Sequence, residues 1–439
     1  METYSTFEYA EIKYEETEGK ERANPEESKL YLNRKSVEYL EKLNIAQVFR
    51  SGIKFQNYVG VVSFRDLRLE ILPKFMRTGE KFVMAEDVNN RKEILSSLVK
   101  MLEYSGWGGI KSVDLTRLGE EDEFFEIYVY LFARNLSSLL KTKRDSSYIR
   151  NYDELRFVKG RIDFKRYGNP ARLHKIPCHY FERSIDTTIN RTLKYVSYLL
   201  TKNVRNRETR RLLQRITSIL EPATLAPVSI SEIDRITFNR LNSSFEPYIN
   251  FCKTFLQRSV LSFQGDNLDF FSFLIPMEIL FERFIAKAVE EIVENEFKNY
   301  ILNIQKKFGH LARIGNTGMF ALQPDIVLFK DNSDKQIIDT KYKLLNPEER
   351  KLGISQQDLY QMYAYCRELN SGECVLLYPE GVNGAIERDF KLGKNGEINL
   401  HVRTISLVNL FENGRLSTDF KKRLKEAIGL NQITYSVSL

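Results

Sequence analysis

The sequence predicts an α+β protein of several domains, with a basic and mainly helical region between two mixed parts. Its 439 residues are enough for two or three domains at about 100–200 residues each. Strand-like alternation occurs toward both ends of the chain, whereas the middle shows helical spacing. We therefore expect an amino-terminal mixed β/α domain at 1–150, a basic helical region at 151–265 and an α/β domain at 266–439.

Composition excludes several classes of protein. Hydrophobic side chains make up 42% and charged side chains 28% of the chain, which is typical of a folded protein and not of a disordered one. No run of about 18 apolar residues occurs, so we expect no membrane span. The acidic first residues lack the apolar core of a signal peptide. The four cysteines form no CxxC pair, which fits the reducing cytoplasm.

The net charge of +7 is concentrated in the middle of the chain. Residues 151–270 hold 20 Lys and Arg against 12 Asp and Glu, whereas residues 271–439 are neutral and residues 1–30 carry a net charge of −5. A basic surface attracts phosphate backbones through counterion release, although solvated helix faces explain the same excess. We expect the first 30 residues to form a polar, acidic lead-in that does not contact nucleic acid.

Residues 57–73 predict a β-hairpin. Its second strand alternates apolar and charged residues, with Leu67, Leu69 and Ile71 on one side and Arg68 and Glu70 on the other. This is the period of a strand with one buried face and one exposed face.

The next segments are assigned from spacing and turn residues. Helices are expected at 92–105, 120–143 and 231–263, two more within 188–220, and a buried strand at 373–379. Residues 145–185 are mixed and predict a loop-rich region. Trp107 lies in a glycine cluster between the first two helices, and we expect it in the core.

Residues 277–297 predict a strongly amphipathic helix. Apolar residues recur in it at helical spacing, and Pro276 stands before its first turn, where proline suits a helix start. Glu278 and Glu282 lie one turn apart in this segment. Either both carboxylates are solvated or one points into a functional site, and spacing alone favours the first interpretation.

A second hairpin can bring two carboxylates and a lysine together. An apolar strand at 326–329 follows Asp325, and the return strand at 336–343 contains Asp339 and Lys341. A three-residue loop would place Asp325 opposite Asp339, and a five-residue loop would place it opposite Lys341. Because Asp339 and Lys341 share a face, either odd loop gathers all three, whereas an even loop puts Asp325 on the other face.

This grouping suits metal-dependent phosphodiester chemistry. Two carboxylates with open positions bind Mg²⁺ through hard oxygen ligands, and the metal activates water and stabilises charge on a phosphate. A nearby lysine positions or deprotonates the water, or neutralises the phosphate. Acid-x-Lys triplets recur elsewhere in the chain. Only the triplet at Asp339 follows an apolar strand and has a second carboxylate, after Pro324, on the preceding strand.

Residues 355–369 predict another amphipathic helix. Ser355 and Asp358 have the spacing of a capping box. Gln361 and Tyr365 lie one turn apart outside the main apolar face, where they can approach a phosphate or a base. The alternative is that they are ordinary surface positions.

These segments together resemble the PD-(D/E)xK nuclease superfamily, and the Gln361-x-x-x-Tyr365 pair resembles an element of its RecB-type exonuclease branch. More closely, the chain resembles the McrC family, the nuclease subunits of McrBC and LlaJI-type restriction systems. The strings that carry this resemblance span most of the chain: VGVVSFRDLRLEILPKF at 59–75, INRTLKY at 189–195, MEILFERF at 277–284, IIDTKYK at 337–343 and DLYQMYAY at 358–365.

The resemblance implies a site, a cofactor and two partners. Its metal ligands would be Asp325, Asp339 and Glu282, with Lys341 as the catalytic lysine and Gln361 as a further catalytic residue. The implied cofactor is Mg²⁺, with Mn²⁺ as an alternative, and the implied substrate is double-stranded DNA. The implied protein partner is a McrB-like AAA+ GTPase ring, stimulated by insertion of the amino-terminal region, so the domain at 1–150 would be the partner-binding domain. GTP would act only through that partner, because this chain has no GxxxxGK[ST] loop.

Other interpretations stay open. One is a non-catalytic subunit that bridges to the partner and activates it, and another is a stand-alone RecB-like DNA exonuclease. His174, Cys178 and His179 suggest a metal corner, but a fourth ligand is missing. The sequence does not specify the DNA target or whether it is methylated.

Overall fold

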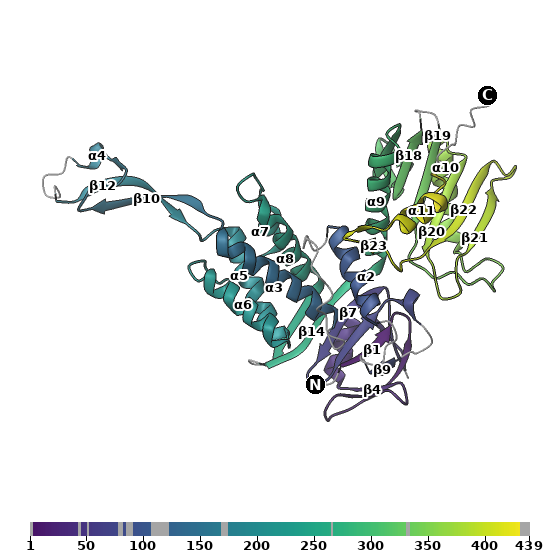
Figure 1. The fold of residues 1–439 in the computed structure, drawn as a ribbon, viewed down its shortest axis with the longest axis horizontal. Coiled ribbons are helices and arrows are strands. Elements are labelled where there is room, and N and C mark those ends of the chain that lie inside the picture. Colours follow the sequence, from purple (N-terminus) through teal and green to yellow (C-terminus); the bar gives the residue numbers. More distant parts are fainter. Residues whose placement is uncertain are drawn as a thin grey trace. The chain divides into compact units, whose positions relative to one another are not determined.

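The computed structural model shows a mixed α/β protein that divides into two compact units (Figure 1). It describes residues 3–42, 45–50, 52–77, 82–84, 91–106, 123–167, 174–264, 267–330 and 334–430. Among these residues, unit 1 contains those up to Phe125 and from Arg258 onward, and unit 2 is Glu126–Gln257. The sequence predicted domain limits near 150 and 265, and the observed limits differ from these. Most of the helix at 124–142 belongs to unit 2, and the strands that follow Arg258 belong to unit 1. Trp107 lies outside the described residues.

Two sheets form the amino-terminal part of unit 1. One has the strand order β13 (Ser259–Gln264), β14 (Asn267–Pro276), β7 (Tyr58–Phe64), β8 (Arg68–Leu72), β1 (Thr3–Phe7) and β9 (Phe82–Met84). The other has the order β3 (Arg22–Asn24), β4 (Lys29–Leu32), β2 (Glu11–Glu16), β6 (Gly52–Phe55) and β5 (Ala46–Val48). Helix α1 (Arg34–Lys42) follows β4, the short 3₁₀ helix η1 (Lys74–Met76) follows β8, and α2 (Arg91–Tyr104) follows β9. The predicted hairpin at 57–73 and helix at 92–105 are confirmed.

The expectation that residues 1–30 form a polar lead-in is wrong. Strand β1 pairs in parallel with β8, so the start of the chain is part of a sheet. Tyr4, Ile12 and Leu30 are buried in one apolar core with Ile53 and Phe55. The acidic side chains of this segment lie mostly between these buried positions and obscured the two-residue period in the overall composition.

The expectation that one face of β8 is exposed is also wrong, because all five residues of this strand are buried. Arg68 pairs with Glu123 at 2.5 Å and Glu70 pairs with Arg91 at 2.9 Å. A charged residue in an alternating strand usually faces solvent, but here each charge has a buried partner far away in sequence.

Unit 2 combines helices with a β-arm. Its helices are α3 (Phe124–Thr142, which begins in unit 1), α5 (Thr188–Asn203), α6 (Arg207–Ile219), α7 (Ile230–Asp234), the 3₁₀ helix η5 (Ser243–Phe245) and α8 (Glu246–Arg258). The arm is an antiparallel sheet of β10 (Ser147–Leu155), β12 (Ile176–Ser184) and β11 (Arg161–Ile162), with the short helix α4 (Phe164–Tyr167) near its tip (Figure 1).

The helix expected at 120–143 is present among the described residues as α3, and the other predictions for unit 2 differ in outcome. The two helices expected within 188–220 are present as α5 and α6. Residues 145–185 are not loop-rich in the described part, because β10 and β12 pair over nine residues. Strand β10 is largely exposed on both faces, so it lacks the apolar alternation that identifies strands. The helical stretch expected at 231–263 is confirmed in part, because α7 and α8 lie within it, but it is interrupted between them and ends before β13.

The Asp186 carboxylate connects three segments of unit 2. It accepts hydrogen bonds from Arg191 Nε and Nη2 at 2.7 and 2.6 Å, and from Thr224 N and Oγ1 at 2.8 and 2.9 Å. The Arg191 hydrogen bonds are the largest cause of a lowered pKa of Asp186. The carboxylate therefore stabilises the folded unit when it is ionised.

Replacing Asp186 with alanine should destabilise the protein by about 1–2 kcal/mol at neutral pH, since solvent around Arg191 weakens the ion pair. The folded pKa lies below the unfolded value of about 3.9, so this stabilisation is complete above that value and is lost as the pH falls through the folded pKa. Urea unfolding at neutral and acidic pH should show the difference between wild type and variant shrinking in acid. An unchanged difference would contradict the assignment, and Asp234→Ala, at an exposed carboxylate, is the control.

The carboxyl-terminal part of unit 1 is a mixed sheet with helices on both faces. Its strand order is β15 (Tyr300–Ile304), β18 (Ile326–Lys330), β19 (Asp334–Thr340), β20 (Glu373–Pro379), β22 (Ile398–Ile405) and β21 (Glu387–Leu392). The helices are α9 (Met277–Glu296), α10 (Gln356–Leu369) and α11 (Thr418–Ala427). Two small hairpins are β16 (His310–Ile314) with β17 (Thr317–Ala321) and β23 (Phe411–Glu412) with β24 (Arg415–Leu416). The predicted helices near 277–297 and 355–369 and the strands at 326–329, 336–343 and 373–379 are confirmed within a few residues.

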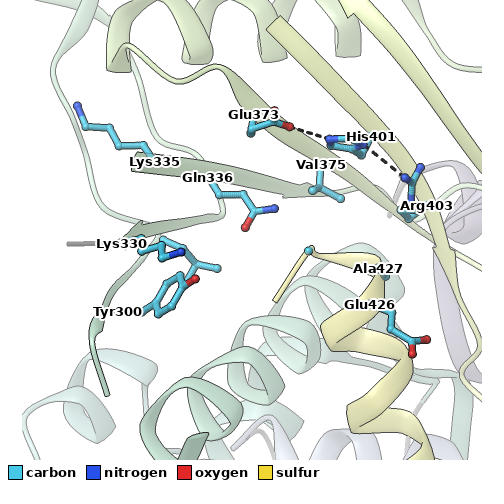
Figure 2. A pocket seen from close by; sticks show the side chains of 12 residues that line it. Tyr300, Lys330, Lys335, Gln336, Glu373, Val375, His401, Arg403, Glu426 and Ala427 are labelled. Carbon is cyan, nitrogen blue, oxygen red and sulfur yellow. Dashed lines mark hydrogen bonds and ion pairs between the residues drawn. The ribbon is translucent and has the colours of Figure 1, made fainter. Parts of the chain in front are cut away.

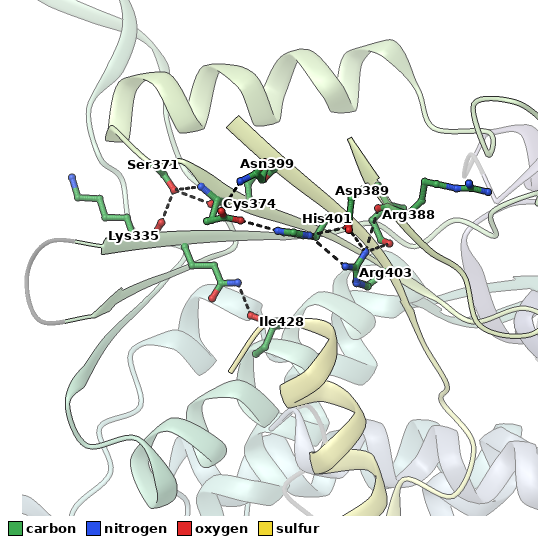
Figure 3. A network of polar contacts seen from close by, with 12 residues as sticks. Lys335, Ser371, Cys374, Arg388, Asp389, Asn399, His401, Arg403 and Ile428 are labelled. Carbon is green, nitrogen blue, oxygen red and sulfur yellow. Dashed lines mark hydrogen bonds and ion pairs between the residues drawn. The ribbon is translucent and has the colours of Figure 1, made fainter. Parts of the chain in front are cut away.

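Neighbouring residues of β19 show which helices cover which face. Ile337 packs in a core with Met362 and Cys366 of α10. Gln336, which points to the opposite face, donates a hydrogen bond to the carbonyl oxygen of Ile428 just after α11 at 2.6 Å. Helices α10 and α11 therefore cover opposite faces (Figure 3). Among the described helices, none combines the length and the apolar character that a membrane crossing requires.

Candidate functional site

The β18–β19 hairpin places Asp325 beside the end of β19. Ile326 lies opposite Ile338, which is the register that puts Asp325 opposite Asp339, the first of the two odd-loop alternatives. Loop residues 331–333 lie outside the described part. Asp325 Oδ2 accepts hydrogen bonds from the backbone N and the Oγ1 of Thr340, both at 2.8 Å. These two donors fix the Asp325 carboxylate against β19.

Asp339 and Lys341 form a largely buried ion pair. Asp339 is only 1% exposed, and its Oδ2 lies 2.5 Å from the Lys341 ammonium nitrogen. Burial raises the pKa of Asp339 to about 7, with a further contribution from Asp325 and an opposing one from Lys341. Burial also lowers the pKa of Lys341, but Asp339 and Asp325 outweigh it and the net pKa is raised. Lys341 is therefore a fixed positive charge beside the carboxylates.

Glu282 of α9 reaches the same group of residues, and Glu278 does not. Gln305 Nε2 donates hydrogen bonds to Glu282 Oε1 and, at 2.8 Å, to Asp325 Oδ1. Burial, followed by the nearby charge of Asp325, raises the pKa of Glu282 to about 7. Glu278 is exposed and accepts a hydrogen bond from Asn57. Of the two glutamates, Glu282 therefore lies beside Asp325 and Glu278 does not.

Two glutamines that the sequence did not single out complete this side of the group. Gln323 Nε2 donates to Gln305 O at 3.0 Å and to Gln305 Oε1 at 2.8 Å, which turns the Gln305 amide nitrogen toward the carboxylates. Gln323 directly precedes Pro324-Asp325, and that position is a signal that could have identified it. Gln305 has no such signal, because it reaches the group only through the fold.

Helix α10 supplies the opposite side. Its capping box at Ser355 and Asp358 is present as predicted. Gln361 Oε1 accepts a hydrogen bond from Lys341 Nζ at 3.1 Å, and Gln361 Nε2 donates to the Tyr365 hydroxyl at 2.9 Å. Tyr365 in turn donates to the Gln323 carbonyl oxygen at 3.2 Å. Gln361 and Tyr365 therefore belong to one chain of hydrogen bonds with the carboxylates and are not free surface positions.

The donor set suits a hard divalent cation, although its side chains are not yet arranged around one. Within the described ranges, no three His, Cys, Asp or Glu side chains are positioned to hold a metal ion. The Gln305 amide joins Glu282 to Asp325, and the Lys341 ammonium pairs with Asp339. The Lys341 charge and the neutral hydrogen-bond donor of Gln305 offset carboxylates whose charge is otherwise disfavoured by burial. The oxygen ligands therefore fit Mg²⁺, provided that the Gln305 amide moves aside.

A separate pocket of about 340 Å³ lies at the other end of the same sheet (Figure 2). Its lining includes Gln336 at the start of β19, together with Glu373 and His401. His401 contacts Glu373 at 2.7 Å (Figure 2) and Asp389 at 2.8 Å (Figure 3), which ties three strands together. Asp339 lies roughly 10 Å farther along β19 at about 3.3 Å per residue. This pocket is therefore not part of the carboxylate–lysine group.

A family model establishes what kind of protein carries this group. The model described as the McrBC 5-methylcytosine restriction system component matches residues 53–379. Because the match covers more than half of the chain, the protein belongs to this family of restriction-system components, as the sequence resemblance indicated. No curated protein matches the chain.

Two solved structures resemble the chain in fold. One is a refined half-complex from a tetradecameric assembly of Thermococcus gammatolerans McrB AAA+ hexamers with bound McrC. Its matching chain has a TM-score of 0.69 and 18% identity, covering 98% of this chain and 99% of that chain. The other is the cryo-EM structure of the Thermococcus gammatolerans McrBC complex, with a TM-score of 0.51 and 21% identity, covering 66% and 88%. At these identities the similarity establishes the fold alone.

Proposed function

We propose that the protein is the Mg²⁺-dependent DNA endonuclease subunit of a GTP-dependent restriction complex in the cytoplasm, and that it stimulates the GTPase of an AAA+ partner ring. The observation that carries this proposal is the meeting of Asp325, Asp339, Glu282, Lys341 and Gln361 at one end of the carboxyl-terminal sheet. That end would be the PD-(D/E)xK nuclease core. The family membership supports the role in restriction.

Each residue of the group has a chemical role in this proposal. Asp325, Asp339 and Glu282 would hold the metal, which supplies an activated water and neutralises charge on the phosphate. Lys341, already protonated beside Asp339, would stabilise negative charge on the scissile phosphate. Gln361 holds the lysine ammonium from the α10 side. In this proposal, Lys341 therefore stabilises charge and Gln361 positions the lysine.

Reconstitution with an McrB-like GTPase is the direct test of the proposal. The complex should cut double-stranded DNA when both Mg²⁺ and GTP are present, and chelation of the metal should stop cleavage. Digestion of DNA ends by the isolated chain without GTP would instead support the stand-alone exonuclease. Comparing methylated with unmethylated DNA in the same assay would define the target.

The β-arm is a candidate surface for the protein partner, beyond the expected partner-binding region at 1–150. Four large side chains on it are well exposed: Tyr148 at 72%, Phe157 at 62%, Phe164 at 74% and Phe181 at 67%. Apolar groups gathered on a projecting element are typical of protein-binding surfaces.

Replacing Phe157, Phe164 and Phe181 with serine should weaken binding of the GTPase ring at least about tenfold, since each buried aromatic anchor contributes about 1 kcal/mol or more. Stimulation of GTP hydrolysis, titrated with the variant chain, measures the change. Leu241→Ser alters another exposed apolar residue of unit 2, at 78% exposure, and should have no effect. Equal stimulation by the triple variant and wild type would remove the arm from the interface.

Helix α6 carries the basic surface that we propose for DNA. Arg207, Arg211 and Arg215 are exposed along it. The other two arginines of this segment have contacts inside unit 2. Arg210 Nη2 donates to the Val204 carbonyl oxygen at 2.6 Å, and the backbone N of Arg205 donates to Glu126 Oε1 at 2.6 Å. The first three are therefore the better residues to change.

Reversing the charge of Arg207, Arg211 and Arg215 with glutamate should weaken DNA binding more than about tenfold. The slope of affinity against salt should fall by about 0.9 for each phosphate that the protein no longer neutralises. Fluorescence anisotropy at several salt concentrations measures both quantities. A matched reversal of the exposed Arg388, Lys391 and Lys394 in unit 1 is the control. If both triple variants weaken binding equally, α6 is an ordinary solvated helix.

A further inference from the structure

Tyr342, the residue that follows Lys341, is hydrogen-bonded to Glu8 at the end of the first strand, β1. Tyr342 comes directly after Lys341 and is only 5% exposed. Its hydroxyl donates to Glu8 Oε2 at 2.5 Å, across 334 residues of sequence. Glu8 lies at the end of β1 and is 1% exposed. The candidate nuclease core is thus joined to the amino-terminal sheet by a buried hydrogen bond.

Lys74 completes this buried cluster. Its backbone N donates to Glu8 Oε2 at 3.2 Å, and its Nζ donates to the Tyr342 carbonyl oxygen at 2.9 Å. The ammonium also lies over the Tyr342 ring, 4.1 Å from the centroid, and over the Tyr9 ring at 4.5 Å. Tyr342 is therefore held at its hydroxyl, its ring and its carbonyl oxygen by residues from two different strand ends.

A second connection reaches α9. The Tyr9 hydroxyl donates to Asn57 Oδ1 at 2.5 Å, and Asn57 Nδ2 donates to Glu278 Oε1 at 2.8 Å. The Asn57 carbonyl oxygen also accepts from the Met277 backbone N at 2.9 Å. Glu278 lies one helical turn before Glu282. The same corner of the amino-terminal sheet therefore contacts both elements that carry the candidate site.

If this cluster served only to fill space, the burial of its charges would be energetically unfavourable. The Glu8 carboxylate and the Lys74 ammonium are both removed from water, and Glu8 Oε1 has no hydrogen-bond donor among the residues that the structure describes. Apolar side chains of the same volume would pack there with equal or better stability. A hydrogen-bonded polar cluster differs from apolar packing because its bonds are directional and fix the orientation of each side chain.

We infer that Tyr342 is a positioning residue, and that Glu8 and Lys74, through it, set the place of Lys341 and Asp339 relative to Glu282. This inference rests on the proposed nuclease function and names the part of the amino-terminal sheet that controls it. Since Asn57 holds the first turn of α9, the two connections together fix the spacing between the carboxylates. A displacement of the amino-terminal sheet would reach the site through these contacts.

Tyr342→Phe removes only the hydroxyl and tests this inference in the full chain assembled with its GTPase partner. Because small displacements of catalytic groups cost about 10- to 100-fold in rate, kcat should fall by that factor while KM for DNA stays within about twofold. Glu8→Gln keeps an acceptor for Tyr342 and should cleave nearly as fast as wild type, whereas Glu8→Leu should match Tyr342→Phe. Asn57→Gly, which suits the positive φ of 52° at this residue, should lower kcat through α9.

Tyr104→Phe is the matched control. The Tyr104 hydroxyl also donates to a glutamate of α9, Glu291, at 2.7 Å, but far from the carboxylate group, so its loss should leave kcat unchanged. The inference is overturned if wild type cleaves and Tyr342→Phe has the kcat of Tyr104→Phe. The inference is also overturned if Glu8→Gln is as slow as Glu8→Leu. Glu8→Gln keeps the acceptor for the Tyr342 hydroxyl and Glu8→Leu removes it, so equal rates would show that this hydrogen bond does not set kcat.

Amide hydrogen exchange keeps this inference separate from the proposed function. Peptides covering 337–343 should exchange at least about tenfold faster in Tyr342→Phe than in Tyr104→Phe, because the end of β19 loses its anchor. If wild type fails to cleave with its partner, the proposed function fails. Hydrogen exchange alone then tests whether the Tyr342 hydroxyl anchors the end of β19. Equal exchange in the two variants would overturn it regardless of cleavage.

Discussion

Replacing Asp339 with alanine should abolish DNA cleavage by the assembled complex, lowering the rate at least about 1,000-fold. The reason is that Asp339 is the most buried carboxylate of the group and the one paired with Lys341. Stimulation of the partner's GTPase should persist, because the change lies inside the carboxyl-terminal sheet. Asp389→Ala, at an exposed carboxylate on the outer strand of the same sheet, should cleave like wild type. Normal cleavage by Asp339→Ala would favour the non-catalytic bridging subunit.

The same position should separate function from stability. An ionised Asp339 is desolvated in the folded protein without metal, so Asp339→Asn should unfold at the same temperature as wild type or higher when no metal is added. Adding Mg²⁺ should raise the unfolding temperature of wild type, because a ligand stabilises the state that binds it, and should not raise that of the variant. Equal shifts for both proteins would place the metal elsewhere. If Asp339→Ala also loses GTPase stimulation, the separation of the two roles is wrong.

Replacing Glu70 with alanine should destabilise the amino-terminal sheet by about 3–5 kcal/mol, the largest stability effect expected in the chain. Glu70 is fully buried and accepts hydrogen bonds from Arg91 Nε and Nη2 at 3.0 and 2.9 Å. It also accepts from Ser5 Oγ at 3.0 Å and from the Phe124 backbone N at 2.9 Å. Its removal leaves the Arg91 guanidinium buried without this carboxylate.

Chemical denaturation of the purified chain, followed by far-ultraviolet circular dichroism, measures the Glu70 effect. The control is Glu38→Ala, which breaks the exposed Arg34–Glu38 pair one turn apart on α1. An exposed pair of this kind contributes less than about 0.5 kcal/mol. A loss at Glu70 as small as that at Glu38 would show that solvent reaches the buried pair.

Local pattern identified the elements of the carboxyl-terminal sheet, because their apolar periods are strong and their ends carry recognisable signals. The two-residue period of strands leaves two alternatives for the register of Asp325 against Asp339, and the structure selects one. The capping box at Ser355 fixed the start of α10 from sequence alone. In such segments, the side chains that determine local structure are neighbours along the chain.

The pattern failed where the deciding partner is distant in sequence. Arg68 and Glu70 are charged but buried, because Glu123 and Arg91 pair with them across the fold. Strand β10 has no buried face of its own, so its nine paired residues gave no alternation. Gln305 joins Glu282 to Asp325 only after three separate elements have met. These partners lie at least 20 residues apart in sequence, beyond the windows of about 11–18 residues in which periodicity is read, so no local pattern can reveal them.

The pairing of β7 with β14 also has a consequence for synthesis of the protein. Residues 58–64 leave the ribosome long before residues 267–276, which complete that edge of the sheet. At about 5–20 residues per second, the interval is roughly 10–40 s, and β7 presents an open hydrogen-bonding edge throughout it. Unit 2 is translated wholly within this interval. Unit 2 therefore has time to fold before the amino-terminal sheet closes, and a slow or defective unit 2 would prolong the time in which nascent chains can aggregate.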